Sequence, residues 1–169
     1  MPVNTFLYFS YGSNMLSSRL RARCPSAEPV GVVELPDHEL RWHKRSKDNS
    51  GKCDVVACPG KLIIGVLYRI KDSDKTALDR AEGLGHGYEE IEAHVLHDGN
   101  NVIAKAYQAT ATDESLTPYG WYKALVIAGA QEHGLPKDYV EQLKLVVSTD
   151  DPNRTRHDRE FRLIEGVSQ

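Results

Sequence analysis

The feature that most constrains this fold is a central series of strand patterns with turn signals between them. Short runs rich in β-branched and aromatic residues recur from residue 30 to residue 110. Asp98-Gly99-Asn100-Asn101 separates the last two runs and favours a tight hairpin turn. The expected strands are Val30–Leu35, Glu39–His43, Cys53–Ala57, Ile63–Ile70, Tyr88–His97 and Val102–Thr110.

One more strand is expected near the N-terminus, where the apolar aromatic run FLYF at residues 6–9 ends before Gly12. The segment MLSSRLRARC that follows Asn14 predicts a short helix, capped by Ser17 or Ser18. A strand-rich centre flanked by helices indicates the α+β class, with a small closed or half-closed sheet.

Helices are also expected on both sides of the last two strands. Asp72 or Ser73 begins one that Gly83 ends, since glycine is common just after a helix C-terminus. The apolar stretch Tyr122–His133 predicts a buried helix, and Pro136 begins another, because proline suits the first turn. The C-terminal residues that follow are expected to form an extended, polar closing segment.

Length and composition fit one globular domain. The 169 residues are 40% hydrophobic and 27% charged, which is ordinary for a folded domain and unlike a disordered or fibrous chain. We therefore expect a single domain over residues 1–169, with a core at about 5–147 and a C-terminal tail at 148–169.

Charge and segment patterns exclude several classes of function. The net charge of −3 argues against a nucleic-acid binder, which usually carries a basic surplus. The N-terminal segment lacks the pattern of a signal peptide, and no apolar stretch approaches the length of a membrane span. Cys24, Cys53 and Cys58 have no evident pairing scheme, so free thiols in a reducing cytoplasm are expected.

The first strand runs directly into the turn Gly12-Ser13-Asn14, and a helix follows. Glycine and asparagine tolerate positive φ, so successive backbone N–H groups can converge here on a carboxylate or phosphate. A plain strand-to-helix turn has the same composition. The segment also lacks the lysine of a P-loop and the second glycine of a GxSxG motif, so the turn alone favours a structural role.

Glu82 occupies an unusual position as the last residue before the glycine that ends the helix. The partial negative charge of a helix C-terminus disfavours a carboxylate there by about 0.3–1 kcal/mol, and lysine or arginine is the common choice. Glu82 is therefore a candidate general base, although a solvated glutamate at a frayed helix end explains its position as well.

Other groups give weaker indications. His94 and His97 point to opposite faces of a strand, and no HExxH or CxxC motif is present, so no metal is expected. No motif supplies a base for Ser13 as a nucleophile. An aromatic group either packs in the core or lines a cavity for a small polar substrate. It consists of Tyr88, Tyr107, Tyr119, Trp121 and Tyr122.

Three segments together resemble the γ-glutamylcyclotransferases. FLYFSYGSNM, from residue 6, is similar to the opening strand and YGSN loop of that family. GVLYRIKDSDKTALDRAEGLGHGYEEIEAHV, from residue 65, resembles its central segment, in which a helix ends in L-D-x-x-E-G. AYQATATDESLTPYGWYKALVIAGAQEHGLPKDYVEQLKLV, from residue 106, resembles the animal-type enzymes. The likeness extends over about residues 5–147.

The resemblance implies a small mixed β-barrel flanked by helices and a reaction that needs no cofactor or metal. In this family the free α-amine of an L-γ-glutamyl group attacks its own γ-carbonyl, which releases 5-oxoproline and the amino acid or amine. Ring closure is unimolecular, so a site that holds the chain curled supplies much of the rate. The implied partner is a small γ-glutamyl substrate, without nucleic acid or membrane; family members often form homodimers.

The resemblance also assigns roles. Glu82 matches the catalytic glutamate, which would take a proton from the α-ammonium and return one to the departing nitrogen. Tyr107 matches a substrate-contacting tyrosine, and Tyr122 a tyrosine beside the pocket. A loop would bind the α-carboxylate of the substrate through backbone N–H groups. The substrate-binding residues of this loop are Tyr8, Phe9, Ser10, Tyr11, Gly12, Ser13 and Asn14.

Some positions depart from the family pattern and leave the leaving group open. The stretch His43–Lys61 diverges where leaving-group contacts are expected, whereas Met15 is a conservative change from leucine. Glu89 and Glu90 match a stretch without a catalytic role. The alternatives are a γ-glutamylamine cyclotransferase, an enzyme that removes a γ-glutamyl protecting group, and a non-enzymatic metabolite binder. Glutathione is a less expected substrate.

Overall fold

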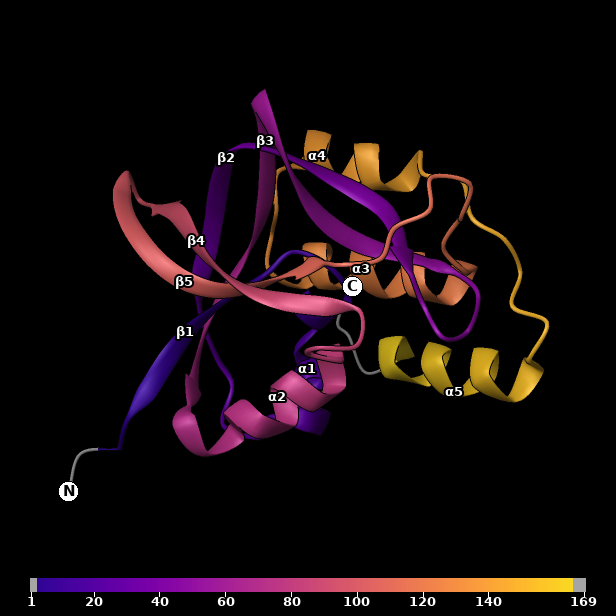
Figure 1. Cartoon of the computed structure of the whole chain (residues 1–169), viewed down its shortest axis with the longest axis horizontal. Helices are drawn as coiled ribbons and strands as arrows, with labels where there is room; N and C mark the ends of the chain where they lie inside the picture. Colours follow the sequence, from indigo (N-terminus) through magenta and orange to yellow (C-terminus); the bar gives the residue numbers. More distant parts are fainter. Residues whose placement is uncertain (1–2, 166–169) are drawn as a thin grey trace.

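A computed structural model describes residues 3–165 and confirms the α+β class (Figure 1). Within these residues, five strands form a closed barrel in the order β1-β3-β2-β4-β5. The strands are β1 (Thr5–Ser10), β2 (Glu28–Arg45), β3 (Gly51–Lys71), β4 (Tyr88–His97) and β5 (Asn100–Ala109).

Strand β1 closes the barrel. It pairs antiparallel with β3 along its whole length, with Tyr8 opposite Tyr68, and parallel with β5, where Tyr8 lies beside Lys105. The other pairings are antiparallel, so the barrel is mixed, as predicted. Because β1 has a neighbour on each side, the loop that follows it is held at a fixed place at one end of the barrel.

The expectation of four short strands between residues 30 and 70 is wrong, because they merge into the long hairpin β2–β3. Pro36 and Gly60 suggest strand ends, yet they lie at a kink inside the two strands. The register shifts between Pro36 and His38, where Asp37 has φ of 58°. The Asp37 carboxylate accepts the N–H of Gly60 at 3.0 Å, which compensates for the interrupted ladder.

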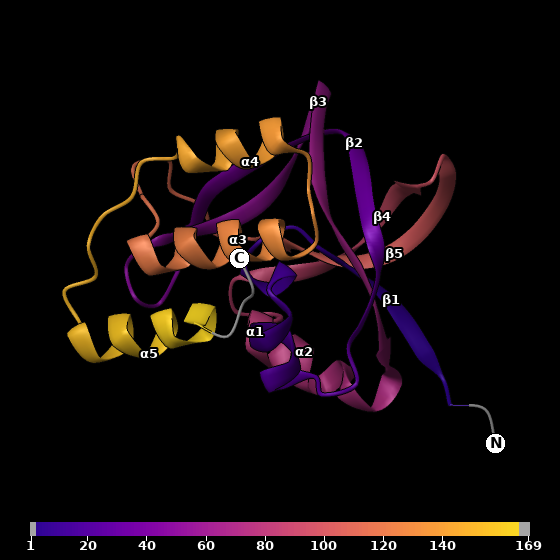
Figure 2. The same ribbon diagram turned by 180° about the vertical axis from the view of Figure 1, so that it is seen from behind.

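The helices lie on two sides of the barrel (Figures 1 and 2). In both views α3 lies between α4 and α5 on one side, and α1 and α2 lie together at another. Ser17 does not cap α1, because the N-cap residue is Leu16 and has no side-chain cap. The helices are α1 (Ser17–Arg23), α2 (Lys75–Glu82), α3 (Gly120–Glu132), α4 (Lys137–Lys144) and α5 (Arg154–Glu165), with 3₁₀ turns at Ser13–Met15 and Asp72–Asp74.

The extended closing segment predicted for the C-terminus is also wrong, because residues 154–165 form α5. Asn153 caps it by accepting the N–H of Arg156 at 3.0 Å. Phe161 and Ile164 pack against the core from its inner face. The many charged residues of this segment conceal the helical spacing of these apolar side chains. No helix in the described part of the chain is long and apolar enough to cross a membrane.

Candidate active site

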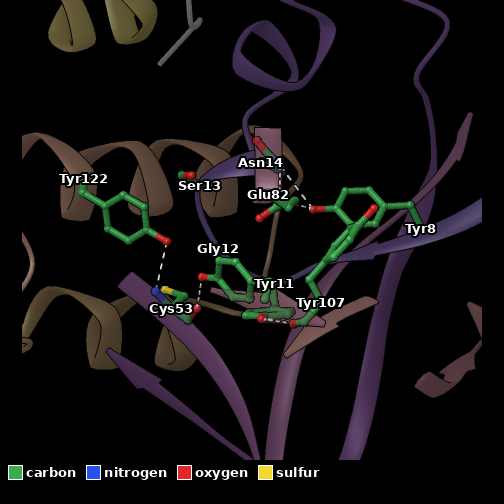
Figure 3. Close-up of a pocket in the computed structure, with 10 residues that line it drawn as sticks. Tyr8, Tyr11, Gly12, Ser13, Asn14, Cys53, Glu82, Tyr107 and Tyr122 are labelled. Atoms are coloured by element: carbon green, nitrogen blue, oxygen red, sulfur yellow. Dashed lines mark hydrogen bonds between the residues drawn. The ribbon is translucent and has the colours of Figure 1, made fainter. Parts of the chain in front are cut away.

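Glu82 lies at the centre of a pocket at the end of the barrel, beside Asn14 and Tyr8 (Figure 3). The Asn14 Nδ2 donates a hydrogen bond to Glu82 Oε1 at 2.6 Å, and the Tyr8 hydroxyl donates to the same oxygen at 3.2 Å. Oε2 accepts no hydrogen bond from any residue between 3 and 165. One carboxylate oxygen is thus fixed, and the other is available to a ligand.

The end of α2 places Glu82 as the sequence predicts. Gly83 takes the left-handed conformation with φ of 69°, its N–H bonds to the Arg80 carbonyl, and the Leu84 N–H bonds to the Asp79 carbonyl. This motif satisfies the last carbonyls of the helix and turns the chain away. Glu82 is therefore the last residue of α2, and it lines the pocket at the end of the barrel.

A hydrogen-bonded chain stabilises the carboxylate in this position. Arg23 donates from Nη1 to Asn14 Oδ1 at 3.1 Å, and Asn14 in turn donates to Glu82. The Arg23 guanidinium thus polarises the amide that contacts the base. This arrangement offsets the unfavourable field of the helix C-terminus.

The loop Gly12–Asn14 lines the pocket, but without the positive φ angles that the composition suggests. Gly12 has φ of −120°, and Asn14 is not among the residues with positive φ. Gly12 is closely packed: a Cβ there would lie 3.1 Å from the Cβ of Cys53 and 3.2 Å from the Tyr122 hydroxyl, so a larger residue would require its neighbours to shift by a few tenths of an ångström. In the described chain the N–H groups of residues 12–14 donate to no other residue.

Tyrosines form the walls of the pocket, and their hydroxyls are tied to the protein. The Cys53 N–H donates to the Tyr122 hydroxyl at 3.0 Å, and the Tyr88 hydroxyl donates to the Cys53 carbonyl at 2.6 Å. The Tyr11 hydroxyl donates to the Tyr107 carbonyl. These bonds tie α3 and β4 to β3, and the loop after β1 to β5, so each of these tyrosine hydroxyls is fixed by another part of the pocket.

Tyr107 connects the pocket to the outer face of α2. Its hydroxyl donates to Asp79 Oδ1 at 2.5 Å, and Lys75 donates to the same oxygen at 2.5 Å. Burial, together with the Asp79 carboxylate at its hydroxyl, raises the pKa of Tyr107. Burial is also the largest cause that raises the pKa of Tyr8 and Tyr122 well above the ordinary value. These phenols therefore stay neutral over the physiological pH range.

Most of the predicted site residues come together, and two do not. Phe9 is fully buried in the hydrophobic core, and Ser10 is buried outside the pocket. Cys53 and Tyr88 also line the pocket, although neither is among the predicted site residues. The sequence indicates only a free thiol for Cys53, and it places Tyr88 in the aromatic group that either packs in the core or lines a cavity. The lining residues are Tyr8, Tyr11, Gly12, Ser13, Asn14, Cys53, Glu82, Tyr88, Tyr107 and Tyr122.

The two neighbouring carboxylates lie elsewhere. Glu89 is exposed on β4, and Glu90 forms ion pairs with Lys75 and, at 3.3 Å, with Lys105. Neither residue lines the pocket. Glu82 is thus the single carboxylate of the pocket within residues 3–165.

Comparison with known proteins first defines the class. The AIG2-like family model matches residues 62–143, a stretch that includes Glu82. A solved structure described as a gamma-glutamyl cyclotransferase superimposes with a TM-score of 0.88 at 30% identity, over 96% of this chain and 100% of that one. A human protein solved as uncharacterised superimposes with a TM-score of 0.84 at 31% identity, over 93% and 98%. The fold is thus that of the gamma-glutamyl cyclotransferase structure, an α+β barrel, and the segment that contains Glu82 is AIG2-like.

Full-length relatives then give the family. The gamma-glutamylcyclotransferase of Mus musculus is 33% identical over 98% of this chain and 91% of its own length. That of Homo sapiens is also 33% identical, with the same coverage. The chain belongs to the gamma-glutamylcyclotransferase family.

Proposed function

We propose that this protein converts an L-γ-glutamyl amino acid or peptide into 5-oxoproline and the free amino acid, with Glu82 as general base. Relatives that carry the name gamma-glutamylcyclotransferase support the reaction. The assignment of the base rests on the hydrogen bonding of the Glu82 carboxylate. Its Oε1 is fixed by Asn14 and Tyr8, and its Oε2 is unbonded in the described chain.

The proposed reaction requires proton transfers rather than a cofactor. The α-ammonium of the substrate has an ordinary pKa near 7.7–8.0, so it is mostly protonated and not nucleophilic at neutral pH. Glu82 takes one proton from it, and the freed amine attacks the γ-carbonyl carbon. A ring C–N bond forms, the bond to the leaving nitrogen breaks, and that nitrogen receives the proton from Glu82. The ring nitrogen gives up a second proton, which Glu82 passes to the leaving amine, so the products are 5-oxoproline and an ammonium group.

The loop would hold the α-carboxylate of the glutamyl group, which is on the same carbon as the reacting amine. The free N–H groups of Gly12, Ser13 and Asn14 suit the α-carboxylate, because backbone donors bind anions without a counter-charge. Tyr107 and Tyr122 would confine the carbon chain between them. A chain fixed at its α-carbon and confined along its length is curled toward ring closure, which supplies much of the rate through proximity.

The test is release of 5-oxoproline from a panel of γ-glutamyl dipeptides, γ-glutamyl-ε-lysine and glutathione. We expect turnover of γ-glutamyl dipeptides, and we expect Glu82→Gln to lower kcat/KM by about 10²–10⁴-fold, because glutamine cannot accept the proton. Thermal unfolding of the variant should match that of the parent, since glutamine keeps the shape of the side chain.

Glu89→Gln is the matched control, because Glu89 is exposed and lies outside the pocket. It removes the same charge and should leave turnover unchanged. Full turnover by the Glu82 variant would contradict the assignment of the base. A folded protein that releases no 5-oxoproline from any of these substrates would contradict the proposed reaction.

A further inference from the structure

A second cavity adjoins the catalytic pocket at Glu82, and we call it the basic pocket. The two cavities share Ser13, Glu82, Tyr88 and Tyr122, so they are continuous. Among the described residues that line the basic pocket, Glu82 is the single acidic one. The basic side chains that line it are Arg19, Arg23, Lys44 and Lys52.

The fold places these cations in two like-charged pairs. Arg19 and Arg23 lie one turn apart on α1, and Lys44 lies opposite Lys52 in the register of β2 and β3. Like charges at these spacings destabilise a helix and a strand pair. Burial, the largest cause in each case, also lowers the pKa of Lys44 and Lys52. A bound anion would relieve the repulsion within each of these like-charged pairs.

Carboxylates of the protein engage one cation of each pair. Arg19 forms an ion pair with Glu160 of α5 at 2.8 Å, and Lys52 lies 3.7 Å from the Asp48 carboxylate. The Nε of Arg19 is buried and has no hydrogen-bond partner in the described chain, so its guanidinium keeps unused capacity.

The other cation of each pair has no carboxylate partner within residues 3–165. Arg23 donates to the amide oxygen of Asn14, and Lys44 forms no ion pair. The Lys44 ammonium lies 4.7 Å from the ring centre of Tyr88, a residue shared by the two cavities. Counting Glu82 with Glu160 and Asp48, the basic pocket has four cations against three carboxylates, and two of the cations form no ion pair in the described chain.

The reaction geometry places the leaving residue in the basic pocket. The nitrogen that leaves takes its proton from Glu82, so it lies next to this side chain. With the glutamyl group in the catalytic pocket beside Gly12 and Tyr107, as the proposed function requires, the leaving residue would extend past Glu82 into the basic pocket. The cations line that pocket.

We propose that the basic pocket selects a dicarboxylic leaving amino acid, so that the preferred substrates are γ-glutamyl-glutamate and γ-glutamyl-aspartate. This inference rests on the proposed function. The two carboxylates of the leaving residue match the two cations that form no ion pair in the described chain, Arg23 and Lys44. Both lysines of the pocket lie within residues 43–61, the stretch that departs from the family pattern.

The experiment compares γ-glutamyl-glutamate with γ-glutamyl-glutamine, which has the same shape and lacks the second charge. We expect kcat/KM for 5-oxoproline release to be about 10-fold or more higher for the glutamate substrate, as charge-assisted bonds are stronger than neutral ones. A ratio near one in the parent protein, with 5-oxoproline released from both, would overturn the proposal and leave the proposed function intact.

Lys44→Met tests the pocket itself. We expect it to reduce the glutamate-to-glutamine ratio by about tenfold. Its resistance to urea should equal or exceed that of the parent, because a like-charged pair has been removed. Lys61→Met, a change of the same kind at an exposed position of β3, should leave the ratio unchanged.

An equal loss on both substrates in Lys44→Met would overturn the proposal, since it would place the lysine on the glutamyl moiety. No 5-oxoproline from either substrate with the folded parent would overturn the proposed function and this inference with it.

Discussion

At the scale of single residues, the side chain of Asn14 both accepts a hydrogen bond and donates one. Its oxygen accepts from Arg23 and its nitrogen donates to Glu82 at 2.6 Å. An amide is the one side chain of this size that can do both. The asparagine of the YGSN motif therefore fixes the carboxylate, a role different from the backbone contacts that the motif suggests.

Asn14→Asp tests this role with almost no change of shape. Two adjacent carboxylates hold a proton between them, so the acidic limb of the pH profile of kcat/KM should move to higher pH by about 1 unit or more. A purely structural loss would lower activity equally at every pH. Asn101→Asp, an exposed change of equal charge on β5, should leave the profile in place.

Single residues also define the limit of prediction from sequence. Glu82 is conspicuous because it conflicts with the helix dipole, and Gly83 fixes where its helix ends. Cys53 gives no such signal, because its contribution is a backbone N–H and C=O that bind Tyr122 and Tyr88. Residues that act through their backbone cannot be recognised from their amino-acid type, because every residue type other than proline has the same backbone donor and acceptor.

At the scale of elements, α5 is held to α3 by a buried carboxylate. Asp151 is almost fully buried; it accepts the indole N–H of Trp121 at 2.8 Å and two bonds from Arg156. The Arg156 guanidinium holds the pKa of Asp151 well below its usual range. These bonds turn the start of the C-terminal segment toward the body of the protein.

Asp151→Asn should lower the free energy of unfolding at neutral pH by about 2 kcal/mol, the scale of hydrogen bonds to a charged group. Because the native carboxylate has a depressed pKa, its contribution is complete above the unfolded value of about 3.9 and declines as the pH falls below it. Urea unfolding at several pH values should show the difference from the parent shrinking below about pH 4. Asp150→Asn, at the exposed neighbouring position, should have little effect, and equal losses in the two variants would contradict this account.

Elements with strong local signals are predicted well, and elements set by tertiary contacts are not. The pair β4–β5 follows from its turn, since Asp98 and Gly99 both have positive φ. The hairpin β2–β3 is mispredicted because Pro36 and Gly60 look like strand ends, while pairing across the barrel carries the strands through them. The cap residue Asn153 was a readable local signal for α5.

At the scale of the whole molecule, barrel closure depends on a close approach of β1 to β3. A Cβ on Gly65 would lie 2.3 Å from the Ser10 carbonyl oxygen and 2.7 Å from the Phe9 ring. Any side chain there would push β1 away from its partner. The loop after β1 would move with it.

Gly65→Ala should therefore lower the free energy of unfolding by about 3 kcal/mol, as for other overpacked cores. It should reduce kcat/KM as well, because residues 12–14 shift. Gly120→Ala is the control: its Cβ would meet nothing closer than 4.0 Å, and alanine favours a helix. It should unfold at the same urea concentration or a slightly higher one. Equal stability of the two variants would show that the barrel adapts at residue 65.

The residues that line the pocket extend along the chain from Tyr8 to Tyr122. This separation determines how much of the chain must be synthesised before the pocket is complete. Tyr8 emerges from the ribosome early, but its parallel neighbour on β5 and the wall from α3 follow only after most of the chain has been translated. A nascent or truncated chain that ends before α3 lacks one side of the site. A chain that ends before α3 is therefore expected to release no 5-oxoproline from a γ-glutamyl compound.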